Sequence, residues 1–169
     1  MTTIATNGKA MAADGRLTKG SMILKEDCDK IIKVFVEQAG ESLLIGVAGC
    51  VAHMDAMIEH IKDTYQGEGV FLGTPFGVDD IEEEGPHPSE TEGLILTEGG
   101  KVFVCAWAEP VIEAHKYQAI GSGADFAIGA MHAGKGPAEA VLIASRVDTN
   151  TNGIVTEKRL ENAGGKQLG

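Results

Sequence analysis

The sequence predicts an α+β fold in which helices pack outside layers of antiparallel sheet. Short runs rich in β-branched residues are typical of strands. One stretch has apolar residues at helical spacing, and two further stretches are alanine-rich and typical of helices. Along the chain these elements follow the order strands, helix, strands, two helices, strand. This order is typical of an α+β protein with layered antiparallel sheet.

The first predicted elements form a hairpin. Residues 2–6 (TTIAT) are rich in β-branched residues, and Asn7-Gly8 is a strong signal for a two-residue turn. Residues 9–13 are expected to form the returning strand, and Asp14-Gly15 marks a second turn. A strand that begins at the second residue must be tied down by its neighbours, because chain termini normally fray.

The central elements are two strands and a helix. Residues 31–36 (IIKVFV) and 43–48 (LLIGVA) predict strands, the second apolar enough for a fully buried sheet. From residue 51 to about residue 65, apolar residues recur at helical spacing, and we expect Gly67 to end this helix. The apolar positions are Val51, Met54, Met57, Ile58 and Ile61.

The last elements are a hairpin, two helices and a strand. Residues 94–96 and 102–107 predict the hairpin, with a glycine-rich turn between them. Residues 123–133 and 137–147 predict two alanine-rich helices, and residues 154–160 predict a final short strand.

Length and composition indicate one globular domain. The chain has 169 residues, of which 43% are hydrophobic and 23% charged. This is enough to bury a core of its own. We expect residues 1–160 to form a single domain and residues 161–169 to form a flexible tail, because the tail has little to bury.

The charge balance disfavours nucleic-acid and anionic-membrane partners. The 14 Lys and Arg against 25 Asp and Glu give a formal net charge of −11, whereas attraction to phosphate needs clustered cations. No apolar stretch reaches the roughly 18 residues of a membrane helix, and the N-terminal segment lacks the apolar core of a signal peptide. We therefore expect a cytoplasmic protein.

The sequence holds no motif for a metal or cofactor, and none is expected. Cys28, Cys50 and Cys105 form no CxxC pair, and the five histidines show no HExxH spacing. Cys50 and Cys105 lack a histidine at motif spacing, so inert thiols are expected rather than nucleophiles. The acidic segment 78–92 is expected to be a solvated loop, with a cation site as the alternative.

Thr2 is the first residue that could carry chemistry. Methionine aminopeptidase removes Met1 when the second residue is small, which would leave a hydroxyl and a free α-amine on the same residue. An α-amine, with an ordinary pKa of about 7.7–8.0, can accept the hydroxyl proton directly or through water. The alternative is that Thr2 only begins a strand.

Five short motifs place Thr2 in a wider pattern. They are Thr2-Thr3-Ile4, Asp14-Gly15-Arg16, Lys30-Ile31, Ala48-Gly49 and Ile120-Gly121-Ser122-Gly123. In this order they resemble the N-terminal-nucleophile proteases of the proteasome β-subunit and HslV family, over about residues 2–160. The resemblance implies a four-layer αββα sandwich, N-terminal nucleophile hydrolase-like, and a threonine peptidase that cuts unfolded polypeptides by acyl transfer after Met1 is removed.

The resemblance also implies a role for each matching residue. Thr2 matches the nucleophile, with Asp14 and Lys30 as the paired charges beside it. Lys30 would keep the Thr2 amine neutral and stabilise a developing alkoxide, and Asp14 would hold Lys30 in place. The backbone N–H of Gly49 would stabilise the oxyanion.

Three further residues match the region around the terminal amine. Ser122 matches a serine near that amine, and helix capping is its alternative role. Asp148 matches a supporting aspartate before the last turn. Thr151 occupies a position where many members of the family have serine.

The family's first substrate pocket maps onto apolar residues in this sequence. They are Leu17, Cys28, Ile32, Val47 and Val51. We therefore expect cleavage after medium or large apolar residues. As partners the resemblance implies copies of the chain in homo-oligomeric stacked rings, together with an unfolding ATPase.

Two other functions remain open at this point. The first is a non-catalytic ring-forming scaffold of the same fold that keeps Met1. The second is another amidohydrolase that uses the same N-terminal nucleophile on small amides.

Overall fold

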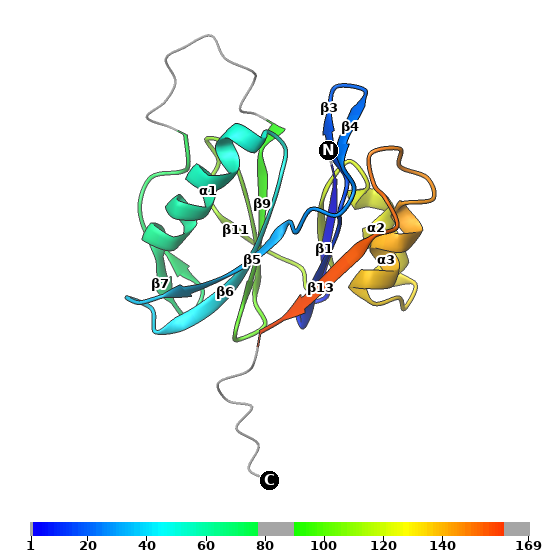
Figure 1. The fold of residues 1–169 in the computed structure, drawn as a ribbon. Coiled ribbons are helices and arrows are strands. Elements are labelled where there is room, and N and C mark those ends of the chain that lie inside the picture. The colour runs from blue at the N-terminus through cyan, green and yellow to red at the C-terminus, as the bar shows by residue number, and fades with distance from the viewer. Residues whose placement is uncertain (1, 78–89, 161–169) are drawn as a thin grey trace.

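Two antiparallel sheets lie face to face, and helices cover the outer side of each (Figure 1). The computed structural model describes residues 2–77 and 90–160. Helix α1 (Val51–Thr64) covers one sheet, and helices α2 (Ala124–His132) and α3 (Pro137–Ala144) cover the other. The predicted α+β class and the four-layer αββα sandwich are confirmed.

The first sheet contains the start of the chain. Its strands lie in the order β12 (Gln118–Gly121), β1 (Thr3–Thr6), β2 (Ala10–Asp14) and β13 (Val155–Arg159). Strand β1 therefore has a hydrogen-bonded neighbour on both sides, which supplies the support that a terminal strand needs.

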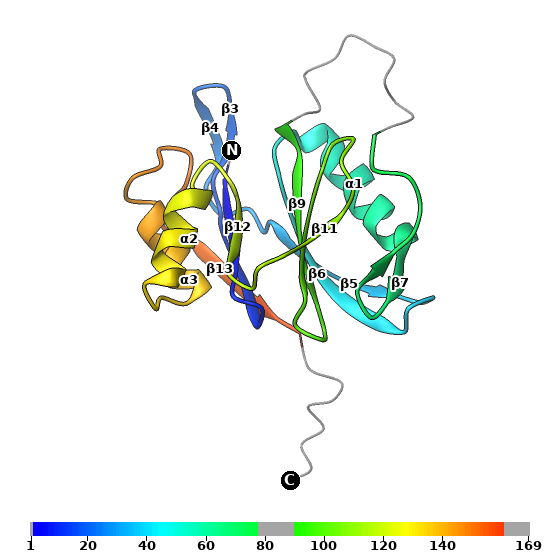
Figure 2. The ribbon, with the colours of Figure 1, turned by 180° about the vertical axis from the view of Figure 1, so that it is seen from behind.

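The second sheet has five strands. They lie in the order β11 (Ile112–Ala114), β10 (Val102–Ala106), β9 (Glu92–Thr97), β6 (Glu41–Ala48) and β5 (Ile31–Val36). Two short hairpins flank the sheets, one formed by β3 (Leu17–Lys19) and β4 (Met22–Lys25), the other by β7 (Tyr65–Gly67) and β8 (Val70–Phe71). Figure 2 shows the chain passing from β11 in this sheet to β12 in the first.

The core consists of three apolar layers, because successive side chains of a strand point to opposite faces. Ile4 of β1 packs between the two sheets, whereas its neighbour Ala5 packs under α2 and α3. On the second sheet, Ile45 faces α1, whereas Leu44 faces the first sheet. The layer under α2 and α3 is built mainly from alanines, which lets these helices lie close to the strands.

The β1–β2 turn is displaced by one residue from its predicted position. Thr6 pairs with Met11, so the two central residues are Gly8 and Lys9 and not Asn7 and Gly8. Gly8 has φ +85°, as the first central position of a type II′ turn requires. The Asn7 side chain instead accepts hydrogen bonds from the backbone N–H groups of Lys9 and Ala10, both at 3.0 Å.

The first helix ends close to its predicted position at about residue 65, but Gly67 does not end it. Helix α1 ends at Thr64, and Gly67 is the last residue of strand β7. Residues 78–89 and the proposed tail 161–169 lie outside the described residues, so both expectations stay predictions. No helix in the described ranges is long and apolar enough to span a membrane.

Candidate active site

Thr2 lies immediately before β1 and is almost completely buried. Its exposed fraction is 3%. The neighbouring strand approaches so closely that a Cβ atom on Gly121 would lie 1.9 Å from the Thr2 carbonyl oxygen. Gly121 also has φ +91°, which favours glycine. The backbone of the neighbouring strand β12 therefore helps to fix Thr2 in position.

The carboxylate of Asp14 lies next to the Thr2 hydroxyl. Asp14 ends β2, whose antiparallel register with β1 brings it opposite the start of the chain. Its Oδ1 accepts hydrogen bonds from the Thr2 hydroxyl and from the Thr3 N–H at 3.0 Å. Its Oδ2 accepts from the N–H groups of Arg16 at 3.0 Å and Asn152 at 3.1 Å. These donors offset the cost of burying the carboxylate.

Lys30 completes the cluster around the hydroxyl. Its ammonium donates to Thr2 Oγ1, to Asp14 Oδ1 at 3.0 Å and to the Arg16 carbonyl at 2.6 Å. Only 8% of its side chain is exposed. Burial lowers the pKa of Lys30 below its ordinary value, although the charge of Asp14 opposes this shift. The Thr2 hydroxyl is thus held between an ammonium and a carboxylate.

Ser122, Asp148 and Thr151 form a second cluster. Ser122 Oγ donates to Asp148 Oδ2 at 2.7 Å, and Thr151 Oγ1 donates to the same oxygen. Thr151 Oγ1 also lies 2.6 Å from Thr3 Oγ1. The cluster therefore reaches the first strand at Thr3, one residue after the candidate nucleophile.

A small cavity of about 30 Å³ opens beside Thr2, Lys30 and Gly49. Gly49 links β6 to α1 and has φ +115°. A Cβ atom there would lie 2.3 Å from the Glu90 carbonyl oxygen, so only glycine fits this backbone path. The structure thus brings Thr2, Asp14, Lys30 and Gly49 together, as their order in the sequence predicts.

The predicted substrate residues divide into two groups. Leu17 and Val51 line this cavity, together with Met54 and Thr18, which the sequence interpretation missed. Cys28 and Ile32 are not among the lining residues. Val47 is not among them either: it is 4% exposed and packs in the core with Ile45.

Asn152 is a site residue that sequence reasoning did not single out. Besides its backbone bond to Asp14, its Oδ1 accepts from the Gly15 N–H at 3.0 Å. Its Nδ2 donates to the Glu26 carbonyl oxygen at 2.7 Å and to the Glu26 carboxylate. The hydrogen bond from Asn152 lowers the pKa of Glu26 most, and the hydrogen bond from Arg16 lowers it further. Local sequence around Asn152 gives no signal for these contacts, because their partners Gly15 and Glu26 lie more than 100 positions away.

The thiol of Cys105 is buried, which makes it poorly suited as a nucleophile. Burial raises the pKa of the Cys105 thiol to about 12, so the thiolate is scarce near neutral pH.

Within residues 2–77 and 90–160, no group of three or more metal-ligating side chains gathers.

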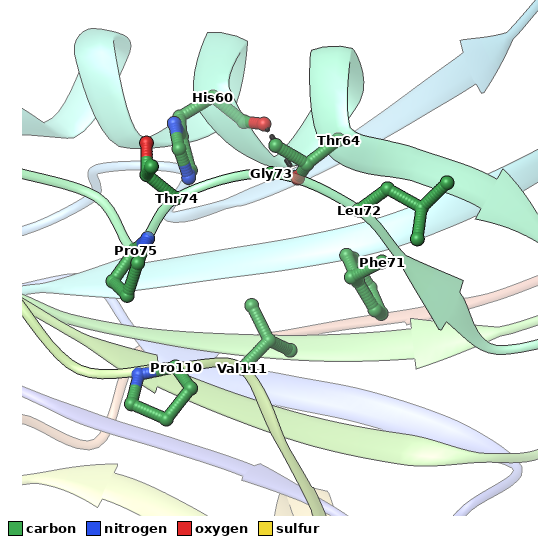
Figure 3. A pocket seen from close by; sticks show the side chains of 9 residues that line it. All are labelled: His60, Thr64, Phe71, Leu72, Gly73, Thr74, Pro75, Pro110 and Val111. Carbon is green, nitrogen blue, oxygen red and sulfur yellow. Dashed lines mark hydrogen bonds between the residues drawn. The ribbon is translucent and has the colours of Figure 1, made fainter.

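A separate pocket of about 160 Å³ lies beside the C-terminal part of α1 (Figure 3). The residues that line it are His60, Thr64, Phe71, Leu72, Gly73, Thr74, Pro75, Pro110 and Val111. The Thr64 hydroxyl is engaged by the His60 carbonyl oxygen at 2.8 Å (Figure 3). The lining pairs no nucleophile with a carboxylate or an ammonium, so the cluster around Thr2 is the better candidate.

Replacing Gly49 by alanine is expected to destabilise the protein by about 1–3 kcal/mol, because the left-handed backbone and the close Glu90 carbonyl both oppose a Cβ atom. Gly129 is a matched control in α2, since a Cβ atom on it would meet nothing within 4 Å. Gly129→Ala should raise stability by about 0.5–1 kcal/mol. Urea denaturation measures the free energy of unfolding of both variants. If the two substitutions changed it equally, the claim that only glycine fits at position 49 would be contradicted.

Comparison with known proteins supports the fold. No protein-family model and no curated protein sequence matches the chain. Among solved structures, eukaryotic HslV from Trypanosoma brucei aligns with a TM-score of 0.68 and 19% identity, over 95% of this chain and 99% of that one. BPH from Thiobacillus denitrificans in complex with epoxomicin aligns with a TM-score of 0.66 and 18% identity, over 96% and 100% of the two chains.

A second structure of Thiobacillus denitrificans BPH gives a TM-score of 0.63 and 18% identity, over 96% of this chain and 98% of that one. These alignments extend over almost the whole length of each protein. The chain therefore has the fold of HslV and of BPH, and the resemblance read from its motifs is confirmed at the level of the fold.

Proposed function

We propose that this chain is a proteasome-like threonine peptidase in which Thr2 Oγ1 is the nucleophile. One observation carries the proposal: the Thr2 hydroxyl donates to Asp14 and accepts from Lys30 beside a cavity that Gly49 also lines. A hydroxyl held in this way is poised to lose its proton, because the nearby ammonium stabilises the alkoxide that forms. The shared fold with HslV and BPH supports the same class of chemistry.

The proposed reaction begins once Met1 has been removed. Thr2 Oγ1 attacks the carbonyl carbon of the peptide bond, and its proton passes to the freed Thr2 α-amine, directly or through water. The backbone N–H of Gly49 stabilises the oxyanion of the tetrahedral intermediate. The C–N bond then breaks, the leaving amine takes the proton, and the acyl group stays on Thr2 as an ester.

A water molecule completes the cycle. The Thr2 amine accepts a proton from this water, which attacks the ester carbonyl. The C–O bond breaks, Thr2 Oγ1 recovers a proton, and the acid product leaves. Both half-reactions need the free amine, so a chain that keeps Met1 is inactive and would serve as a scaffold.

The proposed substrates are unfolded polypeptides. We also propose that copies of the chain assemble into closed rings, since closed symmetry is the norm for homo-oligomers, and that an unfolding ATPase delivers substrates to them. A reducing cytoplasm is the proposed setting. Since a BPH structure is in complex with epoxomicin, we propose that the Met1-free chain binds the same compound.

The cavity lining favours apolar side chains immediately before the cut. Leu17, Val51 and Met54 offer no charge. Arg16 and Lys30 also line the cavity, yet both are engaged by other groups. The Arg16 guanidinium pairs with Glu26 at 3.3 Å and donates to the Thr149 carbonyl oxygen at 2.7 Å, and the Lys30 ammonium donates to Thr2, Asp14 and the Arg16 carbonyl oxygen. A charged substrate side chain would therefore lose its hydration without compensation, whereas an apolar one gains about 1.5–3 kcal/mol on burial.

A positional peptide library incubated with the Met1-free chain tests this function. We expect cleavage after Leu, Phe or Tyr, at least about tenfold faster than after Lys, Arg or Glu, since about 1.4 kcal/mol corresponds to a factor of ten. The same chain with Met1 retained, verified by intact mass, is the matched control and should not cleave. Hydrolysis of small amides alone would favour another amidohydrolase, and a preference for charged residues would contradict the assigned pocket.

A further inference from the structure

A third concave surface, of about 710 Å³, lies at the other end of β1. It is lined by Asn7, Lys9, His115, Lys116, Tyr117 and His132. These residues come from the β1–β2 turn, the segment between β11 and β12, and the last residue of α2. Five strand steps separate Thr2 from Asn7, or about 17 Å at about 3.3 Å per residue. The surface is therefore distinct from the candidate active site.

Positive and hydrogen-bond-donating groups dominate this surface. It is lined by two lysines and two histidines and by no Asp or Glu, in a protein whose formal net charge is −11. Lys9 and Lys116 form no ion pair with any carboxylate of the described residues, whereas Lys25, Lys62, Lys135 and Lys158 do. A local cluster of unpaired cations on an acidic protein creates a site that attracts anions.

Several of the side chains are held in place before any ligand arrives. The stem of Lys116 packs against the turn, where a Cβ atom on Gly8 would lie 3.3 Å from Lys116 Cγ. The rings of Tyr117 and His132 meet edge to face, with centroids 5.2 Å apart. Asn7 Oδ1 is occupied by two backbone N–H groups, so its NH₂ group is the part that can face a ligand.

The C-terminal end of α2, which borders this surface, repels an anion only weakly. The C-terminus of a helix is its negative end. The last carbonyl groups of α2 are, however, occupied: Ala133, Gly134 and Lys135 donate their N–H groups to residues 129–131. The exposed partial negative charge at this end of α2 is thereby reduced.

We propose that this surface binds a phosphate-bearing small molecule. The ammonium groups of Lys9 and Lys116 would pair with phosphate oxygens, and the imidazoles, the Asn7 NH₂ group and the Tyr117 hydroxyl would supply further hydrogen-bond donors. The volume lies within the range of about 300–1,000 Å³ that is typical of small-molecule sites. The rings of Tyr117 and His132 offer a flat surface beside the phosphates, on which an aromatic base can pack. This inference does not depend on the proposed peptidase activity.

Isothermal titration calorimetry on the full chain at low salt tests the proposal, with tripolyphosphate and magnesium-free ATP as the probes. We expect sub-millimolar dissociation constants that weaken at least tenfold in the double variant Lys9→Gln, Lys116→Gln. The double variant Lys19→Gln, Lys33→Gln is the matched control, because it removes the same charge from exposed lysines elsewhere. Binding in this control should change less than twofold.

The two probes separate the contributions within the site. Equal affinity for both would assign binding to the phosphate groups alone. Tighter binding of ATP, lost in Tyr117→Leu, would assign a part to the rings. The proposal is overturned if neither probe binds at millimolar concentration, or if the two double variants weaken binding equally, since the attraction would then be general and not local.

Discussion

Replacing Thr2 by alanine in the Met1-free chain is expected to lower peptide hydrolysis by a factor of at least about 10³. The substitution removes the oxygen that forms the ester intermediate in the proposed reaction, and loss of a catalytic nucleophile commonly has effects of this size or larger. Alanine is also a small second residue, so removal of Met1 should proceed as before. The measurement is the turnover of a fluorogenic peptide, with the mass of the intact chain recorded for each preparation.

The fold should survive this change. Thr2→Ala removes one hydroxyl, whose net contribution to stability is about 1 kcal/mol, and leaves Asp14 and Lys30 in contact with each other. Thr2→Ser retains a hydroxyl and is the matched control, which should keep measurable activity. Unchanged turnover in pure Thr2→Ala would remove Thr2 as the nucleophile and the proposed function with it.

Replacing Lys30 by methionine is expected to reduce both activity and stability. Activity should fall by at least about 100-fold, because removal of a single charge-stabilising donor costs this much in other hydrolases. Stability should fall by about 3–5 kcal/mol, since Asp14 stays fully buried without its cation. Peptide turnover and urea denaturation measure the two effects separately.

Lys158→Met is the matched control for this variant. Lys158 also pairs with an aspartate, Asp29, but both side chains are partly exposed, and such pairs contribute about 0–1 kcal/mol. The control should leave turnover unchanged. If Lys30→Met and Lys158→Met changed turnover and stability by equal amounts, the proposed role of the buried Lys30 ammonium would be contradicted.

The pH dependence gives an independent check on Lys30. Its ammonium must be charged to stabilise the alkoxide, and burial lowers its pKa. As the pH rises through this lowered pKa, the charge is lost, so turnover should fall at a lower pH than the value of about 10.4 for an ordinary lysine. The residual turnover of Lys30→Met should lack this fall.

Sequence patterns predicted the layers of the fold because long elements leave a periodic signal. The helix at α1 and the strands β5 and β6 have enough residues to show which face is buried. Strands β11 and β12 have three and four residues and carry no such signal. Strand β11 pairs with the neighbouring strand β10, whereas strand β12 pairs with β1, a contact between distant parts of the chain that local sequence does not encode.

The site was predicted through motif order and not through local physics. The order of Thr2, Asp14, Lys30 and Gly49 identified residues that the structure brings together. The same reasoning placed Cys28, Ile32 and Val47 in the substrate pocket, and these three are not among the residues that line the cavity beside Thr2. Asn152 was missed because its partner Gly15 is 137 positions away.

The pairing of the first sheet also determines when the site can form during synthesis. Strands β1 and β2 leave the ribosome first, but their outer neighbours β12 and β13 are made much later. Thr3 and Thr151, which share a hydrogen bond, are 148 positions apart. Contacts this distant in sequence form late and slow the folding of the chain. A nascent or truncated chain therefore carries Thr2 without the complete sheet that aligns it, so the candidate nucleophile is synthesised early and its surroundings are completed last.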